Sequence, residues 1–248
     1  MQTLPVMCKN CGESFEGNYC PQCGQSATTG RFTLKDMTHL AAQAFDFDHG
    51  ALFVLRQLTT HPALFLRGYL QGRRVRVFGP MRFLLLSAAL LAVVYSMLEP
   101  GSFARVQLDD GTWQSINVWA NSYTSLLIIL SIPFYSLATW VLFRNWGYRY
   151  AEHLVLNMFV MGFINVLSSV VSVALFWVPV VHEATTPQCT LLYPIVVYIA
   201  LCRRKHAWNI IKAILASIVG IVTLLLLILG FVLLDMVVLQ GKIGLVSL

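Results

Sequence analysis

The chain has 248 residues, of which 57% are hydrophobic and 11% are charged, whereas about 25% of the residues in a typical soluble domain are charged. This composition excludes an ordinary water-soluble globule. Because the 17 Lys and Arg and the 11 Asp and Glu side chains leave long uncharged stretches, we expect an all-α integral membrane protein with about five transmembrane helices.

The first predicted element is a small zinc ribbon in residues 1–30. Four of the six cysteines form two CxxC pairs, Cys8 with Cys11 and Cys20 with Cys23. The two-residue spacer lets both thiolates of a pair lie about 2.3 Å from one zinc ion. A glycine follows each pair, where the knuckle turn favours a residue that tolerates positive φ. A unit of this size has almost no core, so we expect a structural Zn²⁺ to fold it.

Other uses of these cysteines fit the sequence less well. A redox dithiol needs a βαβ context that the sequence does not supply. Disulfides need an oxidising compartment, and the first thirty residues contain no apolar signal segment. Lys9, Glu13, Glu16 and a zinc tetrathiolate of about −2 give a negative module, which argues against nucleic-acid binding. We therefore expect a structural role or the docking of a protein partner.

Residues 31–79 are predicted to form amphipathic helices. Apolar residues recur at helical spacing in residues 34–45, a second short helix runs from about Ala51 to Thr60, and Pro62 opens a third that ends near Gly72. None of these segments is long and apolar enough to span a bilayer. We expect them at the bilayer interface or on the cytoplasmic underside of the bundle.

A dense basic cluster precedes the first predicted span. Each basic residue near an anionic leaflet contributes about 1 kcal/mol, so the cluster is predicted either to fix the topology or to bind lipid headgroups or another anion. Its members are Arg67, Arg73, Arg74, Arg76 and Arg82.

Residues 80–248 are predicted to form the transmembrane bundle. The fourth of five uncharged stretches is short and contains Pro194, so a broken or re-entrant helix, which would reverse the topology after it, is an alternative. The five stretches are Pro80 to Leu98, Tyr123 to Phe143, Leu154 to Val178, Gln188 to Cys202 and Ala213 to Leu234.

The distribution of basic residues predicts the orientation of the chain. If the N-terminus is cytoplasmic, three segments lie on the inner side: the one before the first span, the one between the second and third spans, and the one between the fourth and fifth. They carry nine, two and four Lys and Arg, which is fifteen of the seventeen. Only Arg105 and Lys242 then lie outside. The positive-inside rule therefore favours a cytoplasmic ribbon and an external C-terminus.

One face of the third span carries polar side chains every three to four residues. Asn157, Asn165, Ser168 and Ser172 recur on that face. Polar groups in hydrocarbon need partners, so this face is expected to point into the bundle. It either holds helices together or lines a path for a solute.

Two pairs of ionisable residues lie at the ends of the third span. Glu152 and His153 open it, and His182 and Glu183 follow its other end. An enzyme would use such a pair as a metal ligand or general base. The spans carry no second ligand cluster at the same depth, so we expect no enzymatic activity.

The segment CKNCGESFEGNYCPQCGQ, followed by LTTHPALFLRGYLQGRR and a first span that opens with proline, resembles an uncharacterised bacterial family. Members of that family join a four-cysteine zinc ribbon to a multi-pass membrane domain. The resemblance covers about residues 8–100 and, more loosely, YAEHLVLNMF. It implies the inner membrane of a bacterium and no particular activity. The predicted topology also resembles, in outline, Yip1-type membrane proteins, which are associated with trafficking and scaffolding.

These observations lead to two hypotheses of function. The first is a non-enzymatic membrane scaffold or adaptor, whose ribbon docks a cytoplasmic protein partner. The second is a small transporter or lipid-handling protein that uses the polar face of the third span and the arginine cluster. No ionisable residue lies near the middle of a predicted span, which favours the scaffold. Anionic lipids and a second copy of the chain are further expected partners, and nucleic acid is not.

Overall fold

The described part of the chain is mostly helical, and three of its helices are long and apolar enough to cross a membrane. The description comes from a computed structural model. For residues 111–125 and 231–246 it gives the backbone path alone. The described residues are 5–37, 50–75, 77–98, 111–174, 176, 192–202 and 207–246.

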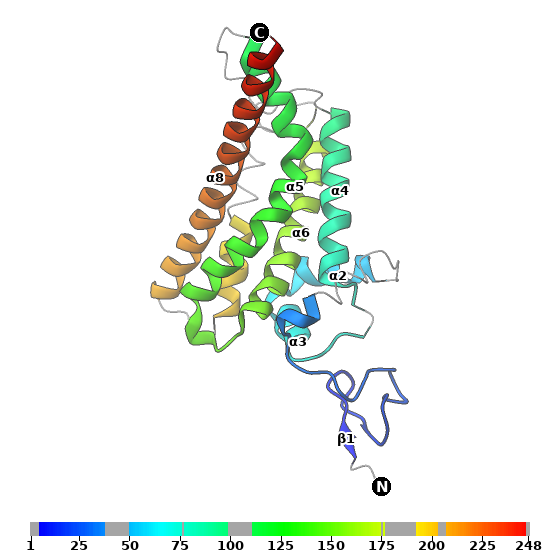
Figure 1. Cartoon of the computed structure of the whole chain (residues 1–248). Coiled ribbons are helices and arrows are strands. Elements are labelled where there is room, and N and C mark those ends of the chain that lie inside the picture. The colour runs from blue at the N-terminus through cyan, green and yellow to red at the C-terminus, as the bar shows by residue number, and fades with distance from the viewer. Residues whose placement is uncertain are drawn as a thin grey trace.

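A small β-hairpin begins the described chain. Strand β1 (Val6–Met7) pairs in antiparallel fashion with β2 (Ser14–Phe15). We call residues 5–30, which contain this hairpin and the four cysteines, the cysteine module. Its core consists of little more than Phe15 and the cysteine side chains. The module lies beyond one end of the helical bundle, and the C-terminal end of α8 lies at the other (Figure 1).

Two short helices lie between the cysteine module and the bundle. Helix α2 (Ala51–Thr60) has the predicted bounds, and α3 (Pro62–Leu70) starts with proline at its first turn, where the missing N–H is not needed. Both contribute buried apolar side chains to the largest core cluster. Of the amphipathic helix expected in residues 34–45, only the turn at 34–37 lies within the described residues.

The long helices of the described chain form the bundle that Figure 1 shows. Helix α6 packs against both α4 and α5, whereas α8 packs against α5. A 3₁₀ turn, η2 (Arg144–Trp146), connects α5 to α6. The long helices are α4 (Pro80–Leu98), α5 (Gly111–Leu142), α6 (Tyr150–Ala174) and α8 (Ala207–Val246).

The predicted bounds of three spans need correction. Helix α4 has the predicted bounds, but α5 begins at Gly111 instead of Tyr123, because the polar stretch before the apolar one also forms helix. Helix α6 begins at Tyr150 instead of Leu154. Its start is fixed by Glu152, whose carboxylate accepts the backbone N–H of Arg149 at 2.8 Å, as in a capping box. Helix α8 extends beyond the predicted range at both ends.

The fourth predicted span, Gln188 to Cys202, is shorter where the structure describes it. The helix there is Leu192–Leu201. At 1.5 Å per residue, its ten residues span about 15 Å, half of a hydrocarbon core of about 30 Å. Residues 188–191 lie outside the described part of the chain. A five-span topology therefore stays a prediction.

Glycines allow two close helix contacts. An added Cβ at Gly162 of α6 would lie 2.6 Å from Cδ1 of Phe83 on α4. An added Cβ at Gly220 of α8 would lie 2.9 Å from the ring of Tyr135 on α5. Small residues at these two positions let the aromatic rings lie directly against the helix backbone.

Candidate metal centre and its contact with the helices

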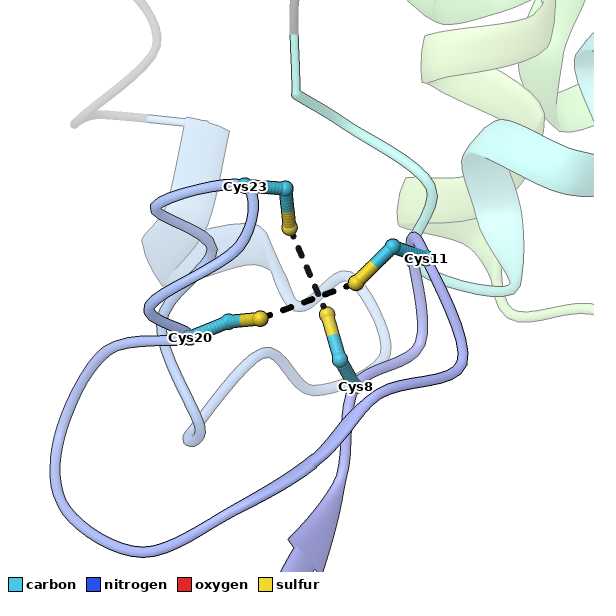
Figure 2. Close-up of side chains that lie close together, drawn as sticks. All are labelled: Cys8, Cys11, Cys20 and Cys23. Atoms are coloured by element: carbon cyan, nitrogen blue, oxygen red, sulfur yellow. Dashed lines mark hydrogen bonds between the residues drawn. The ribbon is translucent and has the colours of Figure 1, made fainter.

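The four cysteine side chains converge on one point (Figure 2). The Sγ atoms of Cys8 and Cys23 are 3.5 Å apart, and those of Cys11 and Cys20 are 3.6 Å apart. All four sulfur atoms lie within 4.8 Å of one another. A tetrahedral ion with bonds of about 2.3 Å would place its sulfur ligands about 3.8 Å apart. The cluster therefore has the dimensions of a four-thiolate metal site.

Two equivalent backbone loops position these thiols. The N–H of Gly12 donates to the carbonyl of Cys8 at 2.9 Å, and that of Gly24 donates to the carbonyl of Cys20 at 2.8 Å. The two glycines have φ values of 83° and 76°, which glycine adopts without the steric cost of a Cβ. The same turn is thus used twice, as the glycine after each cysteine pair predicts.

The local backbone also favours the thiolate form of Cys8. A hydrogen bond from the backbone of Cys11 lowers the pKa of the Cys8 thiol to about 6. Metal ions bind thiolates rather than thiols. Cys8 and Cys20 are buried, and Phe15 packs beside them. The module thus holds a soft, sulfur-only donor set that could bind a metal ion.

Gln25 connects the cysteine module to the turn that follows α3. This side chain is buried, and its Nε2 donates to the carbonyl of Gly72, while its Oε1 faces the backbone N–H of Arg74 at 3.5 Å. Within the module, the ammonium group of Lys9 donates to the carbonyl of Thr29. The Lys9 stem also lies against Gly72, where an added Cβ would be 3.0 Å from its Cδ.

Phe32 inserts into the helical core two residues after the module ends. It is 2% exposed and stacks on Tyr69 of α3 with ring centroids 5.7 Å apart. The guanidinium of Arg74 lies 3.7 Å from the Phe32 centroid and 5.7 Å from the Tyr69 centroid, and it donates to the carbonyl of Gly30 at 2.8 Å. A cation over an aromatic ring is attracted by the ring quadrupole. Arg74 therefore clamps the module to α3.

An ion pair joins the end of the module to the first turn of α6. Two guanidinium nitrogens of Arg31 take part: Nε donates to Glu152 Oε1 at 2.8 Å, and Nη2 donates to Glu152 Oε2 and, at 2.9 Å, to the carbonyl of Gly147. The carboxylate of Glu152 is 2% exposed, while Arg31 is half exposed. Hydrogen bonding to this carboxylate raises the pKa of Arg31.

The predicted arginine cluster does not converge on one anion site. Arg74 holds Phe32, as described above, and Arg67 donates to the carbonyls of Ala200 and Leu201 at 3.1 and 2.8 Å, which caps the helix Leu192–Leu201. Arg82 is buried, and Arg73 is exposed. Arg76 lies outside the described residues.

The polar side chains of α6 are buried and bind neighbouring helices. Asn157 donates to Ser136 at 2.9 Å and to Thr139 at 3.1 Å, both on α5, and accepts a hydrogen bond from Tyr198. His153 Nδ1 lies 3.2 Å from the same Thr139 hydroxyl. This network connects α5, α6 and the helix Leu192–Leu201 around Asn157.

Asn165 binds a different helix from Asn157. Its side-chain amide donates to Ser87 on α4 at 3.4 Å, and its backbone carbonyl accepts the hydroxyl of Ser169 at 2.8 Å. Ser168 and Ser172 are also buried. Because the two asparagines face different neighbours and use their hydrogen bonds there, the polar face acts as a set of interhelical contacts.

The ionisable pair at the start of α6, Glu152 with His153, belongs to no metal-binding group among the described residues. The carboxylate of Glu152 forms an ion pair with Arg31, and the ring of His153 stacks against Trp146 with ring centroids 6.0 Å apart. His182 and Glu183 lie outside the described residues.

Sequence reasoning missed the contact between the module and the helices. It placed the ribbon in residues 1–30 and the amphipathic helices in residues 31–79 without a contact between them, whereas Gln25, Arg31 and Phe32 all bind the helices. The available signal was Phe32, an isolated aromatic residue beside Arg31 in a polar stretch. Their respective partners, Tyr69 and Glu152, are too distant in sequence for local patterns to identify.

The fold and the sulfur cluster define a mostly helical protein of membrane type with a candidate metal centre at one end. Residues 48–92 match the model of a family described as "Protein of unknown function (DUF3667)". This match covers α2, α3 and most of α4 and ends before the polar face of α6. Searches of curated proteins and of solved structures found no significant match, so the likeness to Yip1-type proteins gains no support from them.

Proposed function

We propose that the chain is a non-enzymatic membrane scaffold or adaptor that presents a zinc-stabilised docking module on the cytoplasmic side of a bacterial inner membrane. The observation that carries the proposal is that the module with the four-cysteine cluster is held against the helices by specific side-chain contacts. The attachment consists of the buried Gln25, the clamp of Arg74 on Phe32 and the ion pair of Arg31 with Glu152.

Zinc is the proposed ion because of the donor set. Four thiolates in two CxxC knuckles form a closed tetrahedral site with no position left for a substrate. A closed site supports folding rather than catalysis. The apolar core of the module is too small to stabilise its fold without the ion. Among the described apolar residues of the module, Phe15 is the only one besides cysteine that is buried.

The outer surface of the module supports a protein partner. Met7 is 69% exposed and Tyr19 is 68% exposed, in a module that contacts the helices through other residues. Glu13 and Glu16 are exposed as well, and a zinc tetrathiolate adds about two negative charges. This surface favours a partner with an apolar patch bordered by basic residues, and it disfavours nucleic acid.

The bundle supports anchoring rather than transport. A transport path needs polar groups that a solute can reach, whereas Asn157 and Asn165 are buried and hydrogen-bonded to neighbouring helices. The excess of basic residues in the segments before α4, between α5 and α6 and before α8 supports a cytoplasmic module and an external C-terminus.

Photo-crosslinking from the module tests the adaptor. A photoreactive amino acid in place of Tyr19 should form one defined protein adduct in intact cells, and the additional substitution Cys20→Ser should abolish it while the protein stays in the membrane fraction. The same photoreactive group in place of Leu90, an exposed residue of α4, is the control and should give no such adduct. An adduct that persists unchanged without Cys20, or no protein adduct at all, would contradict the proposal.

A further inference from the structure

A cleft of about 290 Å³ lies where the cysteine module, α2, α3 and the segment before α4 meet. The proposed function does not use it. Most of its lining is apolar, with two amides and one guanidinium. The lining residues are Asn10, Phe53, Gln57, Leu64, Phe65, Gly68, Tyr69, Arg73, Val75 and Val77.

The charge of this cleft comes from Arg73. Among the described residues, no acidic side chain lines it. Arg67 and Arg74 donate to backbone carbonyls, but within the described part of the chain the guanidinium of Arg73 has neither a hydrogen bond nor an ion pair. Arg73 is also exposed, so its charge is available to a ligand at the mouth of the cleft. The electrostatics therefore favour an anion.

The position of the cleft indicates the level of the bilayer surface. Val77 lines it, and three residues later Pro80 begins α4, a candidate membrane span. Leu52 of α2 is 82% exposed and Leu64 of α3 is 66% exposed, although neither helix is long enough to span. Exposed apolar side chains on short amphipathic helices beside a span are expected at the boundary between headgroups and acyl chains.

The size of the cleft limits the occupant. A volume near 300 Å³ lies at the low end for small-molecule sites. This is the size class of a small-molecule ligand, such as a headgroup with the first part of one acyl chain.

We propose that this cleft binds one anionic phospholipid. The phosphate lies at Arg73, the Asn10 and Gln57 amides face the polar linkage region, and the start of an acyl chain lies along Phe53, Leu64 and Phe65. Because Asn10 belongs to the first cysteine loop, the lipid would contact the module and the interfacial helices together. The residues that match the family model, 48–92, include all of the lining except Asn10.

Lipid binding to the full-length protein in uncharged detergent tests this proposal. Native mass spectrometry during titration with phosphatidylglycerol or phosphatidylcholine should show at least one phosphatidylglycerol retained with higher affinity. The substitution Arg73→Gln should weaken it about fivefold, as expected for loss of one basic contact. Gly68→Leu should also weaken it, because an added Cβ at Gly68 points toward the cleft and is 3.5 Å from Arg73 Cδ.

Arg56→Gln is the matched control. Arg56 is an exposed arginine of α2 that does not line the cleft, so its loss should change the affinity less than twofold. Equal binding of the two lipids, or equal weakening by Arg73→Gln and Arg56→Gln, would overturn the proposal. Full displacement of phosphatidylglycerol by millimolar inorganic phosphate would assign the cleft to free anions and overturn the lipid assignment. The metal content of every variant should also be measured. A variant that keeps its metal but loses lipid binding contradicts neither the metal site nor the adaptor proposal.

Discussion

The cysteine module and the helical bundle are stabilised by different means. In the module, Phe15 and the cysteines form the core, and the chain is held by two backbone loops around four thiols. In the bundle, α6 is buried among its neighbours along most of its length, and the polar groups at Asn157 and Asn165 are hydrogen-bonded to adjacent helices. A metal ion can therefore determine whether the first region folds without determining the fold of the second.

Removing the metal should produce the largest difference between the two regions. Structural zinc in small cysteine modules supplies about 10 kcal/mol or more of apparent folding free energy at neutral pH. We expect one zinc ion per purified chain by elemental analysis, and none in Cys20→Ser. The variant should also expose the remaining module thiols to rapid alkylation, while circular dichroism retains the helical signal of the bundle.

Cys202→Ser is the control for that experiment. Cys202 is buried beside Tyr198, outside the sulfur cluster, so the variant should keep its zinc. Loss of zinc from both variants, or retention of zinc by Cys20→Ser, would contradict the assignment of the four ligands. Collapse of the helical signal in Cys20→Ser would show that the two regions depend on one metal-controlled folding unit.

A second substitution should destabilise the bundle and leave the cysteine module unchanged. Gly162→Ala places a methyl group 2.6 Å from the ring of Phe83, which is buried, so α4 and α6 must move apart. Overpacking of this kind costs about 2–3 kcal/mol. We expect the thermal midpoint in detergent to fall by roughly 5–10 °C, since each kcal/mol shifts a chain of this size by about 2–4 °C. Zinc content should not change.

Gly230→Ala is the matched substitution in a helix without such a contact. An added Cβ at Gly230 meets nothing within 4 Å. Alanine has the higher helix propensity, by about 1 kcal/mol, so the midpoint should be unchanged or higher. Equal loss of stability in the two variants would show that close packing at Gly162 is not the cause.

The difference between the regions also explains what could be predicted from the sequence. The candidate metal centre depends on spacing within one segment, so Cys8, Cys11, Cys20 and Cys23 could be placed together from the sequence. The bounds of α2 and α4 follow from local signals such as a proline start and a change in polarity. These features need no knowledge of distant residues.

Features that depend on distant residues were not predicted. The arginine cluster was treated as one site, but Arg67 binds carbonyls that are more than 130 positions away in the sequence, and Arg74 lies over the ring of Phe32, which precedes the interfacial helices in the sequence. The start of α6 was misplaced because Glu152, read as a boundary marker, caps the helix and binds Arg31. Such pairings follow from tertiary packing rather than from hydropathy.

The contact between the two regions should respond to a smaller perturbation than either region. Arg31→Ala removes the hydrogen bonds to the buried carboxylate of Glu152 and leaves that charge with the backbone of Arg149 as its remaining partner in the described structure. Hydrogen bonds to a charged group contribute about 2 kcal/mol. A loss of this size raises the population of the undocked module about thirtyfold, without affecting the metal ligands.

Phe32 provides the measurement of undocking. It is 2% exposed, so chymotrypsin can cleave after it only when the segment leaves the core, and the cleavage rate then follows the population of the open form. We expect Arg31→Ala to raise that rate about thirtyfold with unchanged zinc content. Glu152→Gln combined with Arg31→Ala should raise it less, because no buried charge is left without its partner. An unchanged rate in Arg31→Ala would mean that Gln25 and Arg74 hold the module without the ion pair, and the two regions would then be joined through α3 alone.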